Sequence, residues 1–311
     1  MKIFIETPVW LGDAIMASVA IKNVIEHFRD AQVVIFGSFA ATEIYKAYEG
    51  VERVVVDESK KSKNRWLWLY NMAKEQGKFD LAISFRRQWS TKFLLHFINA
   101  NQKIHYKRLS NVSMHQVKRY NDFASFALKT ELPLTDLYIP FPAHTYPKPT
   151  LGLNPGATYG SAKRWYPQEF ANVAIALHTH YDIVIFGGAG EVDIANEIET
   201  IIKHHGIKNV DNKAGKTSIR SLCELIGGLN LFITNDSGPL HISAAYKIPT
   251  VAIFGPTIST ETHGWNNPHE TIVKLHLSCQ PCMKRTCPLG HHRCMKDIHA
   301  TDVLEAIKQI S

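Results

Sequence analysis

The feature that most constrains the fold is a series of short, unbroken apolar runs separated by segments with helical periodicity. Such runs include Gln32–Phe36, Leu81–Phe85, Asp182–Phe186 and Thr250–Phe254. A run without alternating polar residues indicates a strand covered on both faces, which is typical of parallel sheets. Apolar residues at helical spacing between the runs, as in Asp13–Phe28, predict crossover helices. The chain is therefore predicted to be α/β.

The alternation of strand and helix occurs twice, on either side of a stretch rich in proline. The expected strands are Lys2–Glu6, Gln32–Phe36, Val51–Val56, Leu81–Phe85, Leu151–Leu153, Asp182–Phe186, a short one at Val210, Leu229–Thr234, Thr250–Phe254 and Ile272–Leu275. The expected helices are Asp13–Phe28, Thr42–Tyr48, Arg65–Gln76, Pro167–His178, Glu191–His204, Ser218–Leu225, Leu240–Tyr246 and Thr301–Ile310, the last with Thr301 as N-cap.

The stretch from Pro133 to Pro149 holds five prolines, so we interpret it as an interdomain linker. The predicted domains are residues 1–145 and 146–311, and the last helix is free to pack back on the first domain. A chain of 311 residues suits two domains of this size. Ligands of open α/β sheets bind beyond the carboxyl ends of the strands, so the loops after strands are the candidates for function.

The charge distribution indicates an anionic partner. The net charge is +7, and no acidic residue lies between Asp80 and Asp122, a stretch with several Lys, Arg and His residues. Nucleic acid, an anionic membrane surface or a phosphorylated substrate suits such a stretch, and so does a plain solvated basic face. No window of about 18 apolar residues and no signal-peptide pattern is present, so we expect a cytoplasmic protein without a transmembrane segment.

The C-terminal part of the sequence contains a cysteine cluster, Cys279, Cys282, Cys287 and Cys294. Four thiols within 16 residues can hold a structural zinc ion. The spacing differs from the two-plus-two arrangement of a zinc ribbon. We therefore interpret the cluster as a reduced or partly oxidisable structural loop, and we predict no metal site.

Four loops after strands carry polar residues suited to binding or catalysis. Residues 235–241, Asn-Asp-Ser-Gly-Pro-Leu-His, lie where a strand gives way to a helix, whose free N–H groups form a site for phosphate. The alternative is that Asp236 or Ser237 only caps the helix. In residues 154–167, Lys163 and Arg164 can neutralise a diphosphate, or can belong to an exposed basic loop.

The two remaining loops each contain a carboxylate. Residues 186–191 lack the G-x-G-x-x-G spacing of a dinucleotide fold, and Glu191 is either a ribose contact or an ordinary first-turn acid. Asp13, after the first strand, is either a general base acting on an acceptor hydroxyl or an N-cap. A missing dinucleotide fingerprint argues against an NAD-dependent oxidoreductase.

On these residues, the chain resembles the lipopolysaccharide heptosyltransferases, glycosyltransferase family 9, and most closely their type II branch. The resemblance covers nearly the whole length. It rests on Trp10-Leu11-Gly12-Asp13, on Asn154-Pro155-Gly156-Ala157 through Lys163-Arg164-Trp165, on Asn235-Asp236-Ser237-Gly238 with His241, and on Phe254-Gly255-Pro256-Thr257 with the cysteine tail. It implies a GT-B fold of two Rossmann-like domains facing across a cleft.

The resemblance also implies an inverting transfer of L-glycero-D-manno-heptose from ADP-heptose to heptose I of the lipopolysaccharide inner core, with no cofactor. The acceptor would be the core on Kdo-lipid A at the inner membrane surface. By the match, the catalytic residues are Asp13 and Lys163. The expected donor-binding residues are Thr158, Lys163, Glu191, Asp236, Ser237, Gly238 and His241. For the acceptor, whose carboxylates and phosphates suit the basic N-terminal stretch, the expected binding residues are Trp10, Arg86, Arg87, Lys107 and Arg108. One alternative is a transferase of the same family that uses another core acceptor, such as Kdo. A different alternative is a zinc-containing nucleic-acid-binding protein.

Overall fold

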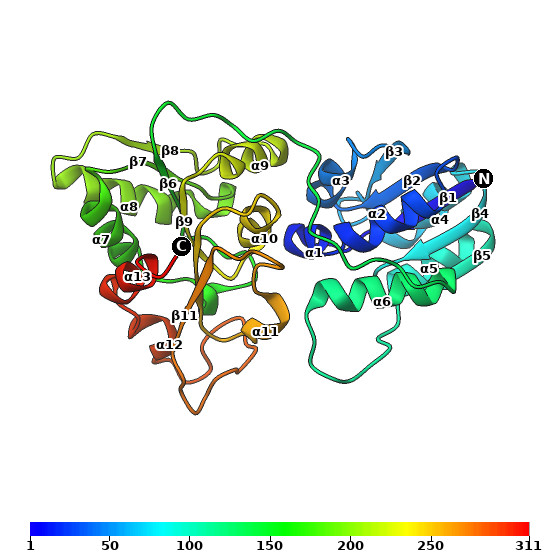
Figure 1. The fold of residues 1–311 in the computed structure, drawn as a ribbon. Helices are drawn as coiled ribbons and strands as arrows, with labels where there is room; N and C mark the ends of the chain where they lie inside the picture. Colours follow the sequence, from blue (N-terminus) through cyan, green and yellow to red (C-terminus); the bar gives the residue numbers. More distant parts are fainter. Residues whose placement is uncertain (311) are drawn as a thin grey trace. The chain divides into compact units, whose positions relative to one another are not determined.

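The computed structural model describes residues 1–310, which divide into two α/β units at Pro140–Phe141 (Figure 1). The boundary lies five residues before the predicted one because residues just after Pro140 belong to the second unit. The N–H of His144 donates to the Glu224 carbonyl, and the Tyr246 hydroxyl donates to the Phe141 carbonyl. The proline-rich stretch contains no helix or strand, as predicted for a linker.

Unit 1 is built on a five-stranded parallel sheet. Its strands are β1 (Lys2–Glu6), β2 (Gln32–Gly37), β3 (Val51–Val56), β4 (Lys78–Ser84) and β5 (Asn99–His105), in the order β3-β2-β1-β4-β5. Its helices are α1 (Leu11–Met16), α2 (Ser18–His27), α3 (Phe39–Tyr45), α4 (Arg65–Glu75), α5 (Trp89–Phe97) and α6 (Gln116–Leu128). The strands form the core with α4 and α5, around Phe4, Phe36 and Phe79. The prediction of a parallel sheet is confirmed.

Two predictions in unit 1 are wrong in detail. The single helix expected over Asp13–Phe28 is two helices that meet at Ala17. The sequence analysis also missed α5, β5 and α6. Strand β5 lies at the edge of the sheet and is mostly exposed, so it has no apolar run to reveal it.

Unit 2 is built on a six-stranded parallel sheet in the order β11-β10-β9-β6-β7-β8. The strands are β6 (Thr150–Asn154), β7 (Asp182–Ile185), β8 (Val210–Asn212), β9 (Leu231–Asn235), β10 (Thr250–Phe254) and β11 (Glu270–Lys274). The α-helices are α7 (Pro167–Leu177), α8 (Val192–His204), α9 (Ile219–Gly227), α10 (Gly238–Ala245), α11 (Ser259–Thr262), α12 (Arg293–Lys296) and α13 (Ala300–Ile307). Two single-turn 3₁₀ helices, Ser161–Lys163 and Ala189–Glu191, follow β6 and β7.

The C-terminal helix α13 lies in the core of unit 2, where Val303 and Ala306 pack with Trp165 and Phe170. Its predicted N-cap, Thr301, is wrong by two residues. The helix begins at Ala300 after His299, whose N–H donates to the Asp302 carboxylate at 2.8 Å. No helix within residues 1–310 combines the length and the apolar character that a bilayer span requires.

Candidate functional site

The two central strands of unit 2 define where a ligand can bind. From β6 the chain proceeds to β7 and β8 on one side, and from β9 it proceeds to β10 and β11 on the other. The connections therefore leave β6 and β9 in opposite directions, and a crevice opens between the loops at such a switch point. The loops after β6 and β9 are residues 155–166 and 236–237, the two segments that the sequence analysis selected.

Two buried asparagines hold these loops together. Asn154, at the end of β6, donates from its side-chain amide to the Ser237 hydroxyl at 3.0 Å. Asn235, at the end of β9, accepts the Trp165 N–H at 3.1 Å and donates to the Pro155 carbonyl at 2.7 Å. Each asparagine thus bonds to the other strand's loop. Because their polar groups are buried and paired, the relative position of the loops is strongly specified.

A lysine and an aspartate meet between the loops. Lys163 Nζ lies 2.5 Å from Asp236 Oδ2, and the side chains are only 12% and 4% exposed. Asp236 also accepts the Thr257 hydroxyl at 2.6 Å and the Thr262 hydroxyl at 3.4 Å. Lys163 further stands over the Tyr159 ring at 4.8 Å. The carboxylate therefore orients the lysine, whose ammonium is the group that can attract an anion.

The start of α10 lies beside this pair. Ser237 is the N-cap residue, but its side chain makes no capping bond, and Asp236 is paired with Lys163 instead. The interpretation of these residues as plain helix caps is therefore not supported. Gly238 opens the helix with N–H groups that have no partner inside the helix, which suits an anion. Thr158 is exposed, whereas His241 is buried behind the helix start.

Glu191 reaches the same region from the loop after β7. Its carboxylate accepts the Gly188 N–H at 2.8 Å. It also lies against Gly156, where an added Cβ would come within 2.1 Å of the carboxyl carbon. Gly156 is thus required for the close approach of the two loops. The structure thus brings Glu191 to the β6 loop.

A second carboxylate near Asp236 was not predicted. Glu270 begins β11, its side chain is 4% exposed, and it accepts the Gly264 N–H at 2.7 Å. Burial, with a smaller contribution from the charge of Asp236, raises the pKa of Glu270 to about 7. A pocket of about 360 Å³ lies at the other end of β10 and β11, lined by residues that include Thr257, Ser259 and Lys274.

The cysteine tail braces the loop that carries Lys163. The Ala162 N–H donates to the Arg285 carbonyl at 3.0 Å, and the Tyr159 hydroxyl donates to the Met283 carbonyl at 2.9 Å. Gly160 lies so close that an added Cβ would stand 2.2 Å from the Arg285 carbonyl oxygen. The tail therefore helps to set the position of the lysine.

All four tail cysteines are free thiols and line one pocket, together with His291 and His292. Burial and the neighbouring thiols raise the pKa of Cys294 to about 11, whereas backbone N–H groups, that of His292 foremost, lower the pKa of Cys287. Within residues 1–310, no three His, Cys, Asp or Glu side chains are arranged as a metal site.

In unit 1, the switch point lies between β1 and β4, so the loops after these strands are the candidates. Asp13 is in the first turn of α1, but the N-cap position is Trp10, so the N-cap interpretation of Asp13 is wrong. The Tyr120 hydroxyl, from α6, donates to Asp13 Oδ1 at 3.2 Å. Burial and the charge of Asp13 raise the Tyr120 pKa well above its ordinary value, so the phenol keeps its proton.

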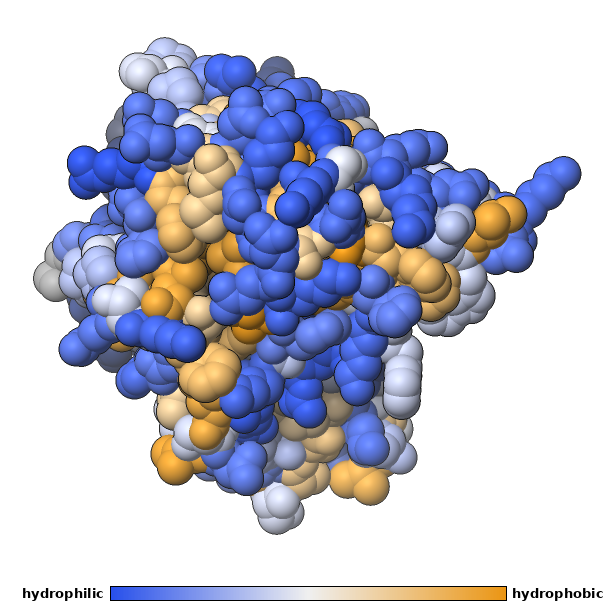
Figure 2. Space-filling model, turned by 90° about the vertical axis from the view of Figure 1, so that its right-hand side faces the viewer, coloured by the Kyte–Doolittle hydropathy of each residue, from blue (hydrophilic) through white to orange (hydrophobic). Residues whose placement is uncertain are grey.

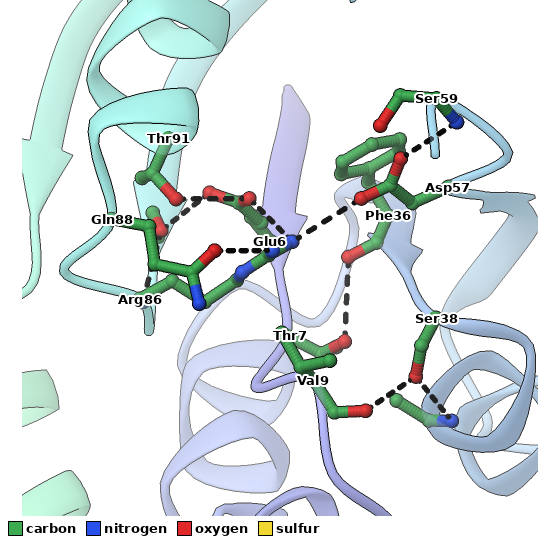
Figure 3. Close-up of polar contacts among 12 residues, drawn as sticks. Glu6, Thr7, Val9, Phe36, Ser38, Asp57, Ser59, Arg86, Gln88 and Thr91 are labelled. Atoms are coloured by element: carbon green, nitrogen blue, oxygen red, sulfur yellow. Dashed lines mark hydrogen bonds and ion pairs between the residues drawn. The ribbon is translucent and has the colours of Figure 1, made fainter. Parts of the chain in front are cut away.

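Arg86 does not lie at the surface with the other predicted acceptor residues. Figure 3 shows its guanidinium between two carboxylates, Glu6 at 2.9 Å and Asp57 at 3.6 Å. Glu6 also accepts the hydroxyls of Ser84 at 2.6 Å and Thr91 at 3.1 Å. All three ionic side chains are less than 10% exposed. Arg86 therefore joins the ends of β1, β3 and β4, and its burial does not support the prediction that it binds the acceptor.

The other predicted acceptor residues are exposed, and they come from three different loops. Trp10 precedes α1, and Arg87 follows β4. Lys107 and Arg108 follow β5, where Lys107 stands over the Phe126 ring at 3.9 Å and Arg108 donates to the Ser110 carbonyl at 2.9 Å. Because all strands of the sheet are parallel, these loops emerge at the same edge as Asp13.

Sequence reasoning missed Tyr120, Thr257, Thr262 and Glu270. Tyr120 is 107 residues from its partner Asp13, and no local pattern links them. Thr257 did carry a signal, because it belongs to the Gly-Pro-Thr segment that follows a strand. Its partner Asp236 lies on the neighbouring strand's loop, and strand order is what brings the two together.

Two units, each built on a parallel sheet with helices, are the architecture of the GT-B class of glycosyltransferases. The profile of glycosyltransferase family 9 (heptosyltransferase) matches residues 74–293. The chain is also 43% identical to lipooligosaccharide heptosyltransferase 2 of Campylobacter jejuni, over 100% of this chain and 98% of that protein. It therefore belongs to glycosyltransferase family 9, and is a heptosyltransferase.

Two solved structures share the fold. Escherichia coli ADP-heptose lps heptosyltransferase II aligns with a TM-score of 0.79 at 21% identity, over 99% of this chain and 98% of that chain. The E. coli heptosyltransferase WaaC with ADP aligns with a TM-score of 0.79 at 14% identity, over 99% of each chain. The predictions of family, enzyme class and fold class are thereby confirmed.

Proposed function

We propose that this enzyme transfers L-glycero-D-manno-heptose from ADP-heptose to the heptose I residue of the lipopolysaccharide inner core, with inversion at the anomeric carbon. The observation that carries the proposal is the full-length 43% identity to a lipooligosaccharide heptosyltransferase 2. The two structural relatives, an ADP-heptose lps heptosyltransferase and a heptosyltransferase with ADP bound, support ADP-heptose as the donor. The protein would act in the cytoplasm, at the inner face of the membrane.

Donor binding is assigned to unit 2. The diphosphate would lie between Lys163 and the start of α10, where the ammonium and the N–H groups of the helix start offset its charge. Thr158, Ser237 and Gly238 would contact the donor, and Glu191 the ribose. For Asp236 we propose a role through Lys163: it would hold the ammonium in place, because a carboxylate directly against a diphosphate would repel it. Buried His241 would support the helix start from behind.

The transfer step is assigned to Asp13. The acceptor hydroxyl oxygen forms a bond to the anomeric carbon while the bond from that carbon to the ADP oxygen breaks. The hydroxyl proton passes to the Asp13 carboxylate, and the negative charge that develops on ADP is stabilised by Lys163. Tyr120 would keep the carboxylate in place through its hydrogen bond. Trp10, Arg87, Lys107 and Arg108 would bind the acceptor core, whose carboxylates and phosphates match their charge.

The test measures ADP release from ADP-heptose with three acceptors: a core ending in heptose I, a core ending in Kdo, and none. We expect release only with the heptose I acceptor, and an inverted anomeric configuration in the product by NMR. Transfer to the Kdo acceptor alone would assign the enzyme to the other acceptor. Full activity of Asp13→Ala would refute the base, and loss of activity in EDTA would refute a reaction without a metal ion.

A further inference from the structure

Two helices of unit 1 share an aromatic surface that the proposed chemistry does not use. Trp66 and Tyr70 on α4 contact Phe93 and Phe97 on α5 edge-on, each pair with ring centroids 4.9 Å apart. Trp89, the first residue of α5 and one helical turn before Phe93, is 79% exposed. These rings lie together rather than singly, and a group of exposed apolar side chains marks an interaction surface more often than scattered ones do.

Cations stand over these rings. Arg65 lies over Trp66 at 5.9 Å, and Lys92 lies over Trp89 at 4.6 Å. The segment before α4 adds Lys60, Lys61 and Lys63, all exposed. Residues 57–97 contain nine Lys and Arg against four Asp and Glu. We call this surface the α4–α5 patch: Trp66, Leu67, Tyr70, Trp89, Phe93 and Phe97 with Lys60, Lys61, Lys63, Arg65, Lys74 and Lys92.

The patch begins at the edge of the sheet where the candidate base lies. Helix α4 follows β3 and α5 follows β4, so the first turns of both helices lie toward the carboxyl edge of the parallel sheet. Asp13 and Arg87 follow β1 and β4 at the same edge. Leu109 and Val112, after β5, are also exposed there, and Val112 is 68% exposed. Figure 2, which views the side on which β4 and β5 lie in Figure 1, shows apolar side chains among hydrophilic ones.

We propose that the α4–α5 patch is a membrane-docking surface whose partner is an anionic phospholipid bilayer. Tryptophan and tyrosine favour the headgroup region, and lysines beside them are attracted to anionic lipid. Leu67, which is 55% exposed, has no ring to stack on a base, so the surface suits acyl chains better than single-stranded nucleic acid. The inference rests on the proposed function in one respect: a lipid-linked acceptor would be presented at this edge.

The first test is sedimentation of the full chain with vesicles of phosphatidylethanolamine and phosphatidylglycerol at 3:1, against phosphatidylcholine alone. Lys60→Gln/Lys61→Gln/Lys63→Gln is expected to weaken binding to the anionic vesicles about a hundredfold, since each lysine near such a surface contributes about a factor of five. Leu67→Ser/Trp89→Ser is expected to weaken it at least tenfold. Both positions are exposed, so folding should persist. Leu134→Ser, an exposed apolar residue outside the patch, is the matched control.

The second test separates docking from catalysis. With a water-soluble, deacylated acceptor, Leu67→Ser/Trp89→Ser should keep the wild-type kcat and KM. With the acceptor embedded in anionic vesicles, its kcat/KM should fall at least tenfold. Wild-type transfer without vesicle binding would overturn the docking surface and leave the function intact. Vesicle binding without any transfer would overturn the function alone. Salt-sensitive binding to an oligonucleotide but not to vesicles, lost in the same variant, would reassign the patch to nucleic acid.

Discussion

Replacing Arg86 by alanine should destabilise unit 1 rather than weaken acceptor binding. The guanidinium lies 2.9 Å from Glu6 and 3.6 Å from Asp57. At an effective dielectric constant of about 20, each attraction is roughly 4–6 kcal/mol, largely cancelled by the cost of burying the charges. Removing only the arginine leaves two buried carboxylates uncompensated. We therefore expect the free energy of unfolding of unit 1 to fall by about 3–5 kcal/mol at pH 7.

The loss of stability in Arg86→Ala should depend on pH, and the pKa of Glu6 sets the direction of that dependence. Burial raises the pKa of Glu6 more than Arg86 lowers it, and loss of the arginine should raise it further. When folding raises the pKa of a carboxyl group, the protein loses stability as the pH rises above the pKa of that group in the unfolded chain, which is about 4.3. The deficit of Arg86→Ala should therefore be larger at pH 8 than at pH 5. For a unit of this size the midpoint should drop by roughly 10 °C or more at pH 8.

The assay is thermal and urea unfolding of the full chain, followed by transfer kinetics, with Arg87→Ala as the matched control. Arg87 is the next residue and is exposed, so its loss should change stability by less than about 0.5 kcal/mol while raising the acceptor KM. The reasoning is refuted if Arg86→Ala is as stable as Arg87→Ala. A stable Arg86→Ala variant with a raised acceptor KM would restore Arg86 as an acceptor residue.

Three further predictions follow from the same geometry. Gly156→Ala should lower the free energy of unfolding by about 1–3 kcal/mol and slow transfer, since the added Cβ would overlap the carboxyl group of Glu191. Gly190→Ala, with no atom within 4 Å of its added Cβ, should leave stability unchanged. Urea unfolding measures both variants. Glu270→Gln should be more stable than the wild type at pH 8, by up to about 3 kcal/mol, and should lose that advantage by pH 5. The reason is that the folded protein raises the pKa of Glu270 to about 7, so the wild type loses stability as the pH rises from about 4.3 to 7. Tyr120→Phe should lower kcat up to about tenfold with an unchanged donor KM, against at least 100-fold for Asp13→Ala; equal kcat values for the two variants would contradict a supporting role for the tyrosine.

The sequence predicts the apolar strands well and the polar strand β5 poorly, for the same physical reason. Buried parallel strands such as Thr250–Phe254 are continuous apolar runs, and that strand was predicted with its observed bounds. Strand β5, Asn99–His105, is held by backbone hydrogen bonds to one neighbour and exposes most of its side chains. Its residues are polar for that reason, so hydrophobic periodicity cannot find it, and α5 and α6 were missed with it.

In the candidate site, too, a general rule finds the right loops but not which side chains in them pair with each other. The rule that ligands bind beyond the carboxyl ends of strands selects the loops of Asp13, Lys163 and Asp236 without any structure. It does not say which polar side chains face a ligand and which face each other. Asp236 lies 73 residues from Lys163, and Arg86 lies 80 residues from Glu6, so both pairs depend on strand order. In each pair, a basic side chain that the sequence analysis offered to a ligand already pairs with a carboxylate of the protein. At Arg86 both opposing carboxylates are buried with it, which leaves a structural role. The Lys163 side chain, 12% exposed, lies beside the start of α10, and in the proposed function an incoming diphosphate shares its ammonium with Asp236.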